Sequence, residues 1–501
     1  MSLDQRCEER RLSVLASLDP AERTRLGQHF TPGPAASLIA GLPRLPQSGR
    51  LRILDPGAGS GSLTAAIVSR VISECPELEL DIIGVEIDPA VATSLNETFA
   101  DCEVAARSAG VKVSTQVIID DIIDLATSID RHVTLGEFDL VIMNPPYRKL
   151  GRSSRERYAV SLLGAECPNL YAAFLAVALE ALRPYGQLVA ITPRSFANGT
   201  YFDQFRRFLL DRLTLDRIHI FESRSKVFAD TDVLQENVIV SGTRDGQQEK
   251  VIISVSDGHA DQPIERVVEY DGVVQPGDRH RFIRIAAQDT DSLVSDAIHS
   301  LPCILADLGL KLSTGRVVDF RSKPNLRDNP AATSVPLIYP GNVRAGRVEW
   351  PRPICKPQAF EVLADRDNKL LLPPGEYVVV KRFSAKEERR RVVAAVWEET
   401  TFPGPVAFEN HLNVYHAAGR GLDPFIARGM SMWLNSSLVD QYFRIFSGHT
   451  QVNATDLRSL RYPSLAALRR LGTGTSQALP PQAEIDSLVT EAVFSGQADD
   501  D

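Results

Sequence analysis

The sequence predicts an α/β fold, in which a Rossmann-like, doubly wound domain is followed by a C-terminal domain of mixed α+β structure. Between residues 51 and 243, short apolar runs typical of strands alternate with segments of helical periodicity. This alternation is typical of a mostly parallel sheet covered by helices on both faces. Beyond about residue 245, short β-like pieces are separated by turns such as QPGD, LPPGE and FPGP, and this change predicts a second domain.

The expected elements of the first domain follow one another along the chain. The strand candidates are LRILD (51–55), DIIGVEID (81–88), VKVSTQVIID (111–120), FDLVIM (138–143), GQLVAITP (186–193), LDRIHIF (215–221) and ENVIVSGT (236–243). Two helix candidates, LTAAIVSRVISEC (63–75) and LYAAFLAVALEAL (170–182), have apolar residues at helical spacing. We expect this domain to span residues 47–245.

Three further segments complete the predicted organisation. Residues 1–46 form a charged helical lead-in that ends in GQHFTP and the apolar helix AASLIAGL. Residues 246–470 form the second domain, with its boundary between 245 and 300. Residues 471–501 form a tail with one short helix and a disordered acidic end.

Composition excludes several classes of protein. Of the 501 residues, 44% are hydrophobic and 24% are charged, as expected for a globular chain of two or three domains. Apolar runs are too interrupted for a transmembrane helix, and charges at the N-terminus argue against a signal peptide, which predicts a cytoplasmic protein. The six cysteines form no C-x-x-C pair and the nine histidines no metal-like pair, so we expect no metal.

Charge is distributed unevenly along the chain. The formal net charge of −9 argues at face value against a nucleic-acid partner, although affinity depends on local basic surface. Basic residues gather in two clusters, at Arg344, Arg347, Arg352 and Lys356, and at Lys381, Arg382, Lys386, Arg389, Arg390 and Arg391. The run KEERRR (386–391) is more typical of a solvated helix face than of a DNA contact.

Glycines and acids follow the first three strands. The turn Asp55-Pro56-Gly57-Ala58-Gly59-Ser60-Gly61 lets a ligand approach the backbone closely, and its spacing matches neither G-x-x-x-x-G-K-[ST] nor G-x-G-x-x-G. Glu86, at the end of the second strand, is placed to accept hydrogen bonds from a ribose diol. Asp120 or Asp121, after the third strand, can meet an adenine edge. Together these strand ends predict a nucleoside-like ligand at the carboxyl edge of the sheet.

The fourth strand ends in Asn144-Pro145-Pro146-Tyr147. Two prolines make this loop rigid. The Asn144 side-chain carbonyl and the Pro145 main-chain carbonyl can accept two hydrogen bonds from a planar amino group. Held in this way, the amine directs its lone pair toward an electrophilic methyl group, and Tyr147 offers a ring on which a flat base can stack.

These motifs, in this order and spacing, resemble the amino-methyltransferases that use S-adenosylmethionine. Upstream, Phe30-Thr31-Pro32 resembles the motif that precedes the glycine turn in adenine-specific DNA methyltransferases. The order F-T-P, glycine turn, N-P-P-Y and large C-terminal domain is similar to the gamma class, for which the TaqI-type modification methylases of type II restriction–modification systems are the model. The resemblance rests on specific motifs over roughly residues 25–245 and is only architectural beyond them.

The resemblance implies a cofactor, a substrate and roles for named residues. It implies S-adenosylmethionine, double-stranded DNA bound by a target-recognition domain, and a cognate restriction endonuclease as functional partner. The implied cofactor contacts are Thr31, Asp55, Gly57, Gly59, Glu86 and Asp121, and the implied catalytic residues are Asn144, Pro145, Pro146 and Tyr147. Asp120 is the alternative to Asp121, which is favoured because an apolar pair follows it. A second aromatic ring is expected on the opposite face of a flipped adenine, with Phe228 as the nearest match and Phe196 as its competitor.

Other interpretations stay open. N-P-P-Y also occurs in enzymes that methylate a protein glutamine or an RNA base, although these lack F-T-P and a large C-terminal part. A DNA-recognition subunit without catalysis would keep the fold, but the intact motifs argue against it. His411 and His416 are interpreted as structural or DNA-facing. The polar segment Ser447–Asn453 is either an ordinary loop or one that reaches base edges or phosphates.

Overall fold

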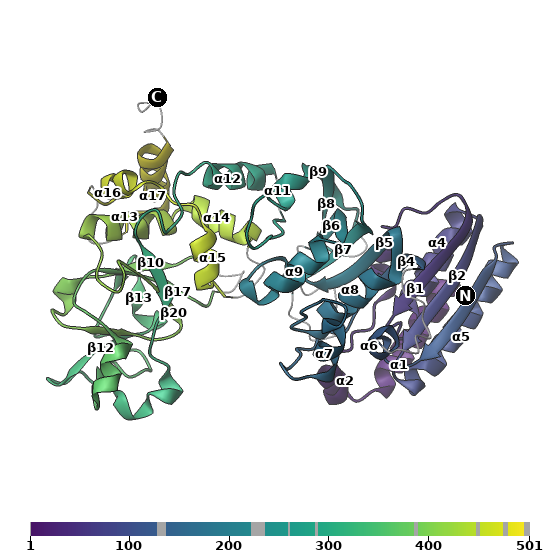
Figure 1. The fold of residues 1–501 in the computed structure, drawn as a ribbon, viewed down its shortest axis with the longest axis horizontal. Coiled ribbons are helices and arrows are strands. Elements are labelled where there is room, and N and C mark those ends of the chain that lie inside the picture. Colours follow the sequence, from purple (N-terminus) through teal and green to yellow (C-terminus); the bar gives the residue numbers. More distant parts are fainter. Residues whose placement is uncertain are drawn as a thin grey trace. The chain divides into compact units, whose positions relative to one another are not determined.

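The computed structural model describes residues 2–127, 137–221, 236–258, 261–285, 289–384, 389–446, 451–473 and 479–494 (Figure 1). The chain divides into two compact units, Met1–Ala287 and Gln288–Asp501, and each is described by itself. Phe228, together with parts of the segments 386–391 and 447–453, lies outside the described residues. Within the described ranges, no helix is long and apolar enough to cross a membrane.

The first unit is built on a nine-stranded sheet of order β3-β2-β1-β4-β5-β7-β6-β8-β9. The strands are β1 (Ser48–Pro56), β2 (Glu77–Glu86), β3 (Val113–Ile119), β4 (Phe138–Met143), β5 (Leu182–Pro193), β6 (Leu213–Phe221), β7 (Asn237–Arg244), β8 (Lys250–Ser256) and β9 (Ile264–Glu269). The first five strands pair in parallel, whereas β7 runs antiparallel to β5 and β6. The strand order reverses between β1 and β4, where sheets of this kind bind ligands. The predicted doubly wound fold is confirmed.

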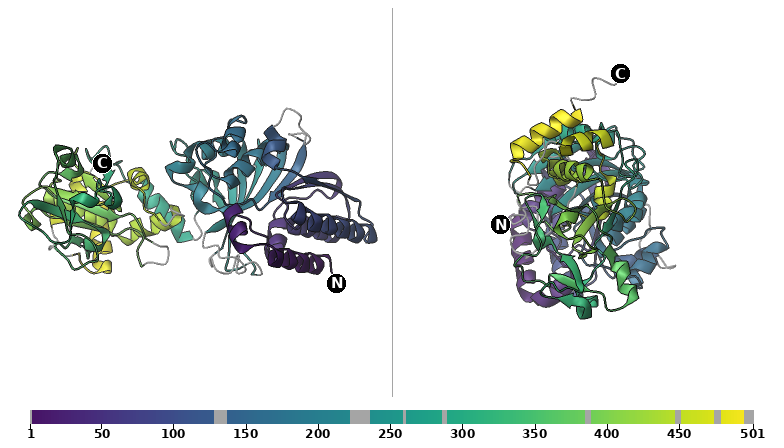
Figure 2. Two further views of the ribbon diagram at one scale, coloured as in Figure 1. Left: turned by 90° about the horizontal axis from the view of Figure 1, so that it is seen from below. Right: turned by 90° about the vertical axis from the view of Figure 1, so that its left-hand side faces the viewer.

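Helices cover both faces of this sheet (Figure 2). They are α1 (Leu3–Ser17), α2 (Pro20–Leu26), α3 (Gly33–Ala40), α4 (Ser62–Glu74), α5 (Pro89–Ser108), α6 (Ile122–Thr127), α7 (Arg155–Ser161), α8 (Leu170–Ala181) and α9 (Asp203–Leu210), with short 3₁₀ turns at Arg194–Ala197 and Thr200–Phe202. On one face α1, α3, α4 and α5 enclose Leu140 and Ile142, and on the other α6, α8 and α9 enclose Val141 and Met143. Successive residues of β4 therefore alternate between two cores, as a sheet buried on both faces requires.

Helix α8 carries part of the first core to the edge of the sheet. Its sequence is rich in Ala and Leu, which favour helix, and every residue of α8 except Glu180 is buried. A helix that is apolar on all sides must be enclosed by other elements. Its first two turns include Leu170 and Phe174, which line the cavity described below.

The first unit extends beyond the boundary expected at residue 245. Strand β8 pairs in parallel with β6, β9 pairs antiparallel with β8, and α11 (Tyr270–Val273) follows. The unit therefore ends at residue 287, and the QPGD turn lies inside it. Residues 1–46 are also part of this unit, because α1 and α3 share a core with α4.

The second unit is mixed α+β, as expected. It contains a six-stranded sheet of order β10-β20-β17-β18-β14-β13 and a five-stranded sheet of order β11-β15-β12-β19-β16. The strands are β10 (Lys311–Thr314), β11 (Leu326–Arg327), β12 (Ser334–Ile338), β13 (Val343–Arg344), β14 (Arg347–Val348), β15 (Ala359–Glu361), β16 (Leu371–Leu372), β17 (Tyr377–Lys381), β18 (Ala394–Trp397), β19 (Val406–Phe408) and β20 (Leu412–His416). The helices are α12 (Asp289–His299), α13 (Pro424–Leu434), α14 (Ser437–Phe446), α15 (Ala454–Ser459), α16 (Leu465–Thr473) and α17 (Gln482–Val489).

Two smaller expectations for the second unit have different outcomes. The tail contains the short helix expected there, α17, followed by a π-helical turn at Thr490–Phe494. By contrast, the end of KEERRR is not a solvated helix face. Arg391 is buried, and its backbone N–H donates to the Asp440 carboxylate.

Candidate active site

A cavity of about 240 Å³ lies at the carboxyl edge of the first sheet, beside the reversal of strand order. Its walls come from segments that are distant in sequence, namely residues 26–31, the turn after β1, the ends of β2 and β3, the loop after β4 and the start of α8. Among the residues singled out in the sequence, it is lined by Thr31, Asp55, Gly57, Gly59, Glu86, Asp120, Asp121, Asn144 and Pro146. Pro145 and Tyr147 belong to the same loop as Asn144 without lining the cavity.

The glycine turn after β1 depends on the absence of side chains. Gly57 and Gly59 have φ values of +71° and +57°, a region that favours glycine. A Cβ atom on Gly57 would lie 3.1 Å from the Phe174 ring, and one on Gly59 would lie 3.3 Å from the Phe30 ring. The turn therefore fits tightly between two aromatic rings and presents bare backbone to the cavity.

Asp55 is the buried carboxylate at the floor of this turn. Its Oδ2 accepts a hydrogen bond of 2.9 Å from Thr64 Oγ1, whereas Oδ1 has no hydrogen-bond partner within the described part of the chain. Burial raises the pKa of Asp55 to about 7, and the nearby Glu86 carboxylate adds to this rise. A buried acceptor without a partner is costly, and a cationic ligand in the cavity would satisfy it.

Glu86 is held in one orientation at the end of β2. Its Oε2 accepts from the Gly59 N–H at 2.9 Å, and its Oε1 accepts from the Asp88 N–H at 3.0 Å. Burial raises the pKa of this carboxyl group, although the backbone hydrogen bonds favour its charged form. Each oxygen keeps a further lone pair, so both can accept hydrogen bonds from a ligand diol.

Asp120 and Asp121 both line the cavity but differ in their partners. Asp121 Oδ1 accepts from the Ile123 N–H at 2.9 Å, at the start of α6, and Oδ2 pairs with Arg155 Nη2 at 2.6 Å. Burial raises the pKa of the Asp121 carboxyl group, and Arg155 opposes this effect. Asp120 is exposed, and its Oδ1 accepts from the Asp121 N–H at 2.7 Å. The choice between them as the adenine contact stays a prediction.

Asn144 is buried, and its amide is held by a segment more than a hundred residues earlier in the chain. Asn144 Nδ2 donates to the His29 carbonyl at 2.9 Å and to Thr31 Oγ1 at 3.0 Å. These two acceptors occupy both amide hydrogens and therefore determine where Oδ1 lies. The main chain of the loop is also anchored, because the Tyr147 N–H donates to the Gly27 carbonyl at 3.0 Å.

Tyr147 packs inside the loop rather than along the cavity wall. Its hydroxyl lies 3.1 Å from Asn144 Oδ1 and 3.3 Å from the Ile191 carbonyl, and burial raises its pKa far above the ordinary value. Its ring centroid is 4.9 Å from that of His29 and 6.3 Å from that of Tyr171. Tyr147 is half-buried as a residue and packs against the core, and its predicted stacking on a base stays a prediction.

The two candidates for a second stacking ring are separated by burial. Phe196 is 2% exposed and packs edge-to-face against Phe205 in the core. Its ring has no free face for a base in this conformation. Phe228, the residue favoured from the sequence, lies outside the described residues.

Several cavity residues were missed by sequence reasoning. His29 lies in the wall, and burial together with the charge of Arg23 lowers its pKa to about 4. Arg148 directly follows the Asn144–Tyr147 loop and pairs with Glu156 at 2.7 Å. Arg155 joins the wall through its pair with Asp121. The sequence signal for Arg148 and Arg155 was the group of basic residues that closely follows N-P-P-Y.

The histidines of the second unit differ in exposure. His416 is buried and its Nδ1 accepts from the Gly419 N–H at 2.9 Å, which agrees with a structural role. His411 is partly exposed, pairs with Glu409 and packs against the Phe383 ring at 5.0 Å. Among the described residues, no group of three or more His, Cys, Asp or Glu side chains could hold a metal ion.

Comparison with known proteins agrees with this geometry. The model of the Eco57I restriction-modification methylase family matches residues 95–228. The chain is 40% identical over 484 residues to the type II methyltransferase M.BsuBI of Bacillus subtilis, covering 94% of this chain and 95% of that one. It is 36% identical over 499 residues to the type II methyltransferase M.PstI of Providencia stuartii, covering 98% of each. In fold it is similar to the type IIL restriction-modification enzyme MmeI, solved in complex with DNA, with a TM-score of 0.58, 10% identity, and coverage of 98% of this chain and 75% of that one. The chain therefore belongs to the family of type II restriction–modification methyltransferases.

Proposed function

We propose that the protein transfers a methyl group from S-adenosylmethionine to the exocyclic amino group of an adenine in double-stranded DNA. It would act as the modification arm of a restriction–modification system, beside a cognate restriction endonuclease. The family of the chain supports the DNA substrate and the biological role. The observation that carries the proposal is the fixed orientation of the Asn144 amide beside the cavity.

The cavity fits the proposed cofactor on the chemistry of its walls. Asp55 Oδ1 is a buried acceptor without a partner, which suits the cationic amino group of the methionine part. Glu86 presents two oriented oxygens to a ribose diol, and Asp121, or Asp120, lies where an adenine edge would reach the end of β3. The backbone of Gly57 and Gly59 allows close approach. Bound there, the cofactor would supply an electrophilic methyl group.

Asn144 and Pro145 orient the amine that receives this group. The Asn144 amide hydrogens are both donated to the protein, and Oδ1 accepts from the Tyr147 hydroxyl at 3.1 Å, which leaves its second lone pair to accept from a target amino group. The Pro145 carbonyl would accept the second amino hydrogen. Two acceptors in one rigid loop align the nitrogen lone pair for in-line attack, and such positioning can lower a barrier by roughly 7–11 kcal/mol. The methylated nitrogen then loses a proton to reach its neutral product form.

The target base has to leave the duplex before it can enter this cavity. We assign its stacking partner on one side to Tyr147, which is half-buried and whose hydroxyl contacts Asn144 Oδ1. Residues 288–501 are proposed as the target-recognition unit, since a large second domain distinguishes DNA adenine enzymes from those that methylate a glutamine amide or an RNA base. Thr31 supports the same choice, because the F-T-P motif that carries it is in direct contact with Asn144.

The test is transfer of a labelled methyl group to unmethylated genomic DNA, followed by sequencing of methylated bases. The wild-type protein should label adenine at one short site, and Asn144→Ala should lose about 100- to 1,000-fold in rate, the effect of removing a key positioned group, while it still binds the cofactor. Asn96→Ala, which removes an exposed amide from α5, is the matched control and should keep full activity. Labelling of cytosine, of RNA or of protein instead would reject the adenine assignment, and sequence-specific DNA binding without labelling would indicate a recognition subunit.

A second pair of variants tests the orientation of Asn144. Thr31→Val keeps the shape of the side chain but removes the acceptor for Asn144 Nδ2, whereas Thr31→Ser keeps it. One lost hydrogen bond predicts a roughly fivefold to tenfold fall in kcat for Thr31→Val. Thr31→Ser should recover most of this loss. Equal activity of the two variants would show that the amide is oriented by other contacts.

A further inference from the structure

The segment directly after the catalytic loop carries unpaired positive charge. Residues 148–158, RKLGRSSRERY, contain five basic side chains and one carboxylate. Three of the five are held in ion pairs, Arg148 with Glu156, Arg155 with Asp121 and Asp124, and Arg157 with Glu166. Lys149 and Arg152 are exposed, and their side chains have neither an ion-pair nor a hydrogen-bond partner among the residues that the structure describes.

The backbone at Lys149 is anchored next to the cavity wall. Lys149 forms an antiparallel bridge with Asn169, flanked by hydrogen bonds from the Leu170 N–H to the Arg148 carbonyl at 2.7 Å and from the Leu150 N–H to the Pro168 carbonyl at 3.0 Å. Arg148 and Leu170, on either side of this bridge, both line the cavity. The backbone at Lys149 is therefore anchored one residue from the cavity wall, while its exposed side chain extends into solvent.

An exposed aromatic ring lies beside the same bridge. Tyr201 is 58% exposed, and its hydroxyl donates at 3.3 Å to the Pro168 carbonyl, the same atom that accepts from the Leu150 N–H. Its neighbour Phe202 faces inward and stacks on Tyr171 with ring centroids 5.8 Å apart. The shared Pro168 carbonyl thus keeps the Tyr201 hydroxyl next to the basic segment, and the inward-facing Phe202 anchors the turn that carries Tyr201.

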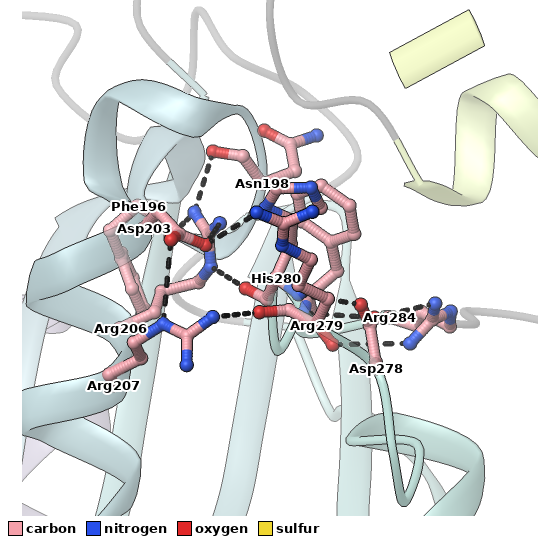
Figure 3. Close-up of polar contacts among 10 residues, drawn as sticks. Phe196, Asn198, Asp203, Arg206, Arg207, Asp278, Arg279, His280 and Arg284 are labelled. Carbon is pink, nitrogen blue, oxygen red and sulfur yellow. Dashed lines mark hydrogen bonds and ion pairs between the residues drawn. The ribbon is translucent and has the colours of Figure 1, made fainter. Parts of the chain in front are cut away.

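Residues on both sides of Tyr201 in the sequence are held by polar contacts, which Figure 3 shows around Arg206 and Asp203. Buried Arg206 donates to the carbonyls of Phe196 and Asn198 at 3.1 and 3.0 Å, and its Nε donates to the His280 carbonyl at 3.0 Å. Asp203 accepts from His280 Nδ1 at 3.0 Å on the same side. A ring held in place before binding loses little conformational freedom when a partner arrives.

We propose that Lys149, Arg152 and Tyr201 form a rim that binds the sugar–phosphate backbone of the substrate duplex beside the extruded base. This inference rests on the proposed function. Free exposed cations are suited to phosphate contacts, and an exposed tyrosine can stack on a base or pack on a sugar. A chain with a net charge of −9 needs local positive charge wherever DNA approaches, and the rim places it at the cavity.

The charged part of the rim is tested by the salt dependence of DNA binding. The probe is a fluorescent mixed-sequence duplex of about 30 base pairs, long enough to cover the expected footprint of a few helical turns. The slope of log Kd against log salt should fall by about one for each of Lys149→Gln and Arg152→Gln, and by about two in the double variant. The matched control is Arg107→Gln, which removes an exposed cation at the opposite edge of the sheet, one with no ion-pair partner in the described part of the chain, and should leave the slope unchanged. An unchanged slope in the double variant, or an equal change in the control, would overturn the assignment.

The aromatic part of the rim is tested on the same duplex. Tyr201→Ala should weaken binding about tenfold, as expected for the loss of one stacked contact, without changing the salt slope. Tyr201→Phe removes only the hydroxyl and should bind like wild type. If the two variants bind equally, the ring makes no contact with DNA. Thermal unfolding of each variant checks that the fold is retained.

The outcomes separate this proposal from the proposed function. Asn144→Ala should lose methyl transfer but keep the wild-type salt slope, because it lies outside the rim. Wild-type protein that binds no duplex at any salt concentration would reject the DNA substrate altogether. Wild-type protein that binds and methylates DNA, with a slope insensitive to Lys149 and Arg152, would reject the rim alone.

Discussion

Carboxylates at the two edges of the first sheet have pKa values shifted in opposite directions. At the carboxyl edge, Asp55 and Glu86 are buried, and burial raises the pKa of both. At the amino edge, Glu79 is exposed beside Lys112, and this partner lowers its pKa. Both sets of carboxylates belong to the same parallel strands, so strand structure alone does not explain the difference. The difference lies in burial: the carboxylates at the carboxyl edge line a cavity, and the one at the amino edge faces solvent.

The comparison shows which edge of the sheet lowers the stability of the folded protein. A buried carboxylate oxygen that lacks a partner among the described residues, such as Asp55 Oδ1, destabilises the protein, whereas an exposed ion pair is nearly neutral. Natural sequences keep such conflicts mainly at functional sites. The predictions below test whether the cost at Asp55 is linked to cofactor binding.

The largest effect is expected from Asp55→Asn. This change removes the charge proposed to meet the cofactor's amino group, and the loss of one charge-assisted hydrogen bond predicts a fall in cofactor affinity of about 10- to 100-fold. The thermal stability of the apo protein should stay equal or rise, since an ionised group no longer has to be buried. Calorimetric titration with S-adenosylmethionine and a thermal melt measure the two quantities.

Asp81→Asn is the control for this variant. Asp81 lies on β2 and pairs with Arg50 at 2.8 Å, away from the cavity. It should bind the cofactor like wild type. If Asp55→Asn binds the cofactor as tightly as this control, the two edges do not differ in the way described.

The pH dependence sharpens the comparison with a smaller effect. Burial raises the pKa of Asp55 from an ordinary 3.8 to about 7, so the folded chain holds a proton that the unfolded chain releases between these values. This contribution to stability is present below pH 3.8 and is lost as the pH rises through about 7. Cofactor affinity should move in the opposite direction and rise about tenfold from pH 6 to pH 8, because the cation binds the ionised carboxylate.

Asp55→Asn again provides the reference for the pH profile. Glu86 also has a raised pKa and can contribute to the wild-type profile. The variant keeps Glu86 and loses only the titration of the Asp55 carboxyl group. The difference between the two profiles therefore isolates Asp55. Parallel profiles for wild type and variant would mean that Asp55 does not titrate in this range.

Much of the carboxyl edge could be predicted from the sequence because its parts are local. Each strand is directly followed in the sequence by its glycine turn, its acidic residue or N-P-P-Y. Because parallel strands end at one edge of the sheet, this order alone predicts that the three motifs lie close together. The contact between Thr31 and Asn144 could be expected only from the order of motifs, since 113 residues separate them. The pair between Arg155 and Asp121 depends on how α7 packs against α6, and no local pattern describes that packing.

The second unit was less predictable for a physical reason. Strands β11, β13, β14 and β16 contain two residues each, too few to show the alternation that identifies a strand. The charged run KEERRR is typical of a solvated helix face. Arg391, at its end, is nevertheless buried, and its backbone N–H donates to the Asp440 carboxylate. Within the range 245–300 expected for the boundary, the sequence does not show that the turn-rich segment around β8 and β9 still belongs to the first sheet, which places the division at residue 287.

The smallest effect is expected at the amino edge, from Lys112→Gln and Glu79→Gln. The hydrogen bond between the two side chains raises the pKa of Lys112 and lowers that of Glu79, but both groups are fully exposed, so solvent and salt screen their attraction. Each single variant and the double variant should therefore melt like wild type, with no measurable coupling in a double-mutant cycle. Methyl transfer should also be unchanged, because neither residue lines the cavity. A loss of activity in either variant would show that the amino edge takes part in function, and burial alone would then no longer distinguish the functional edge of the sheet from the solvated one.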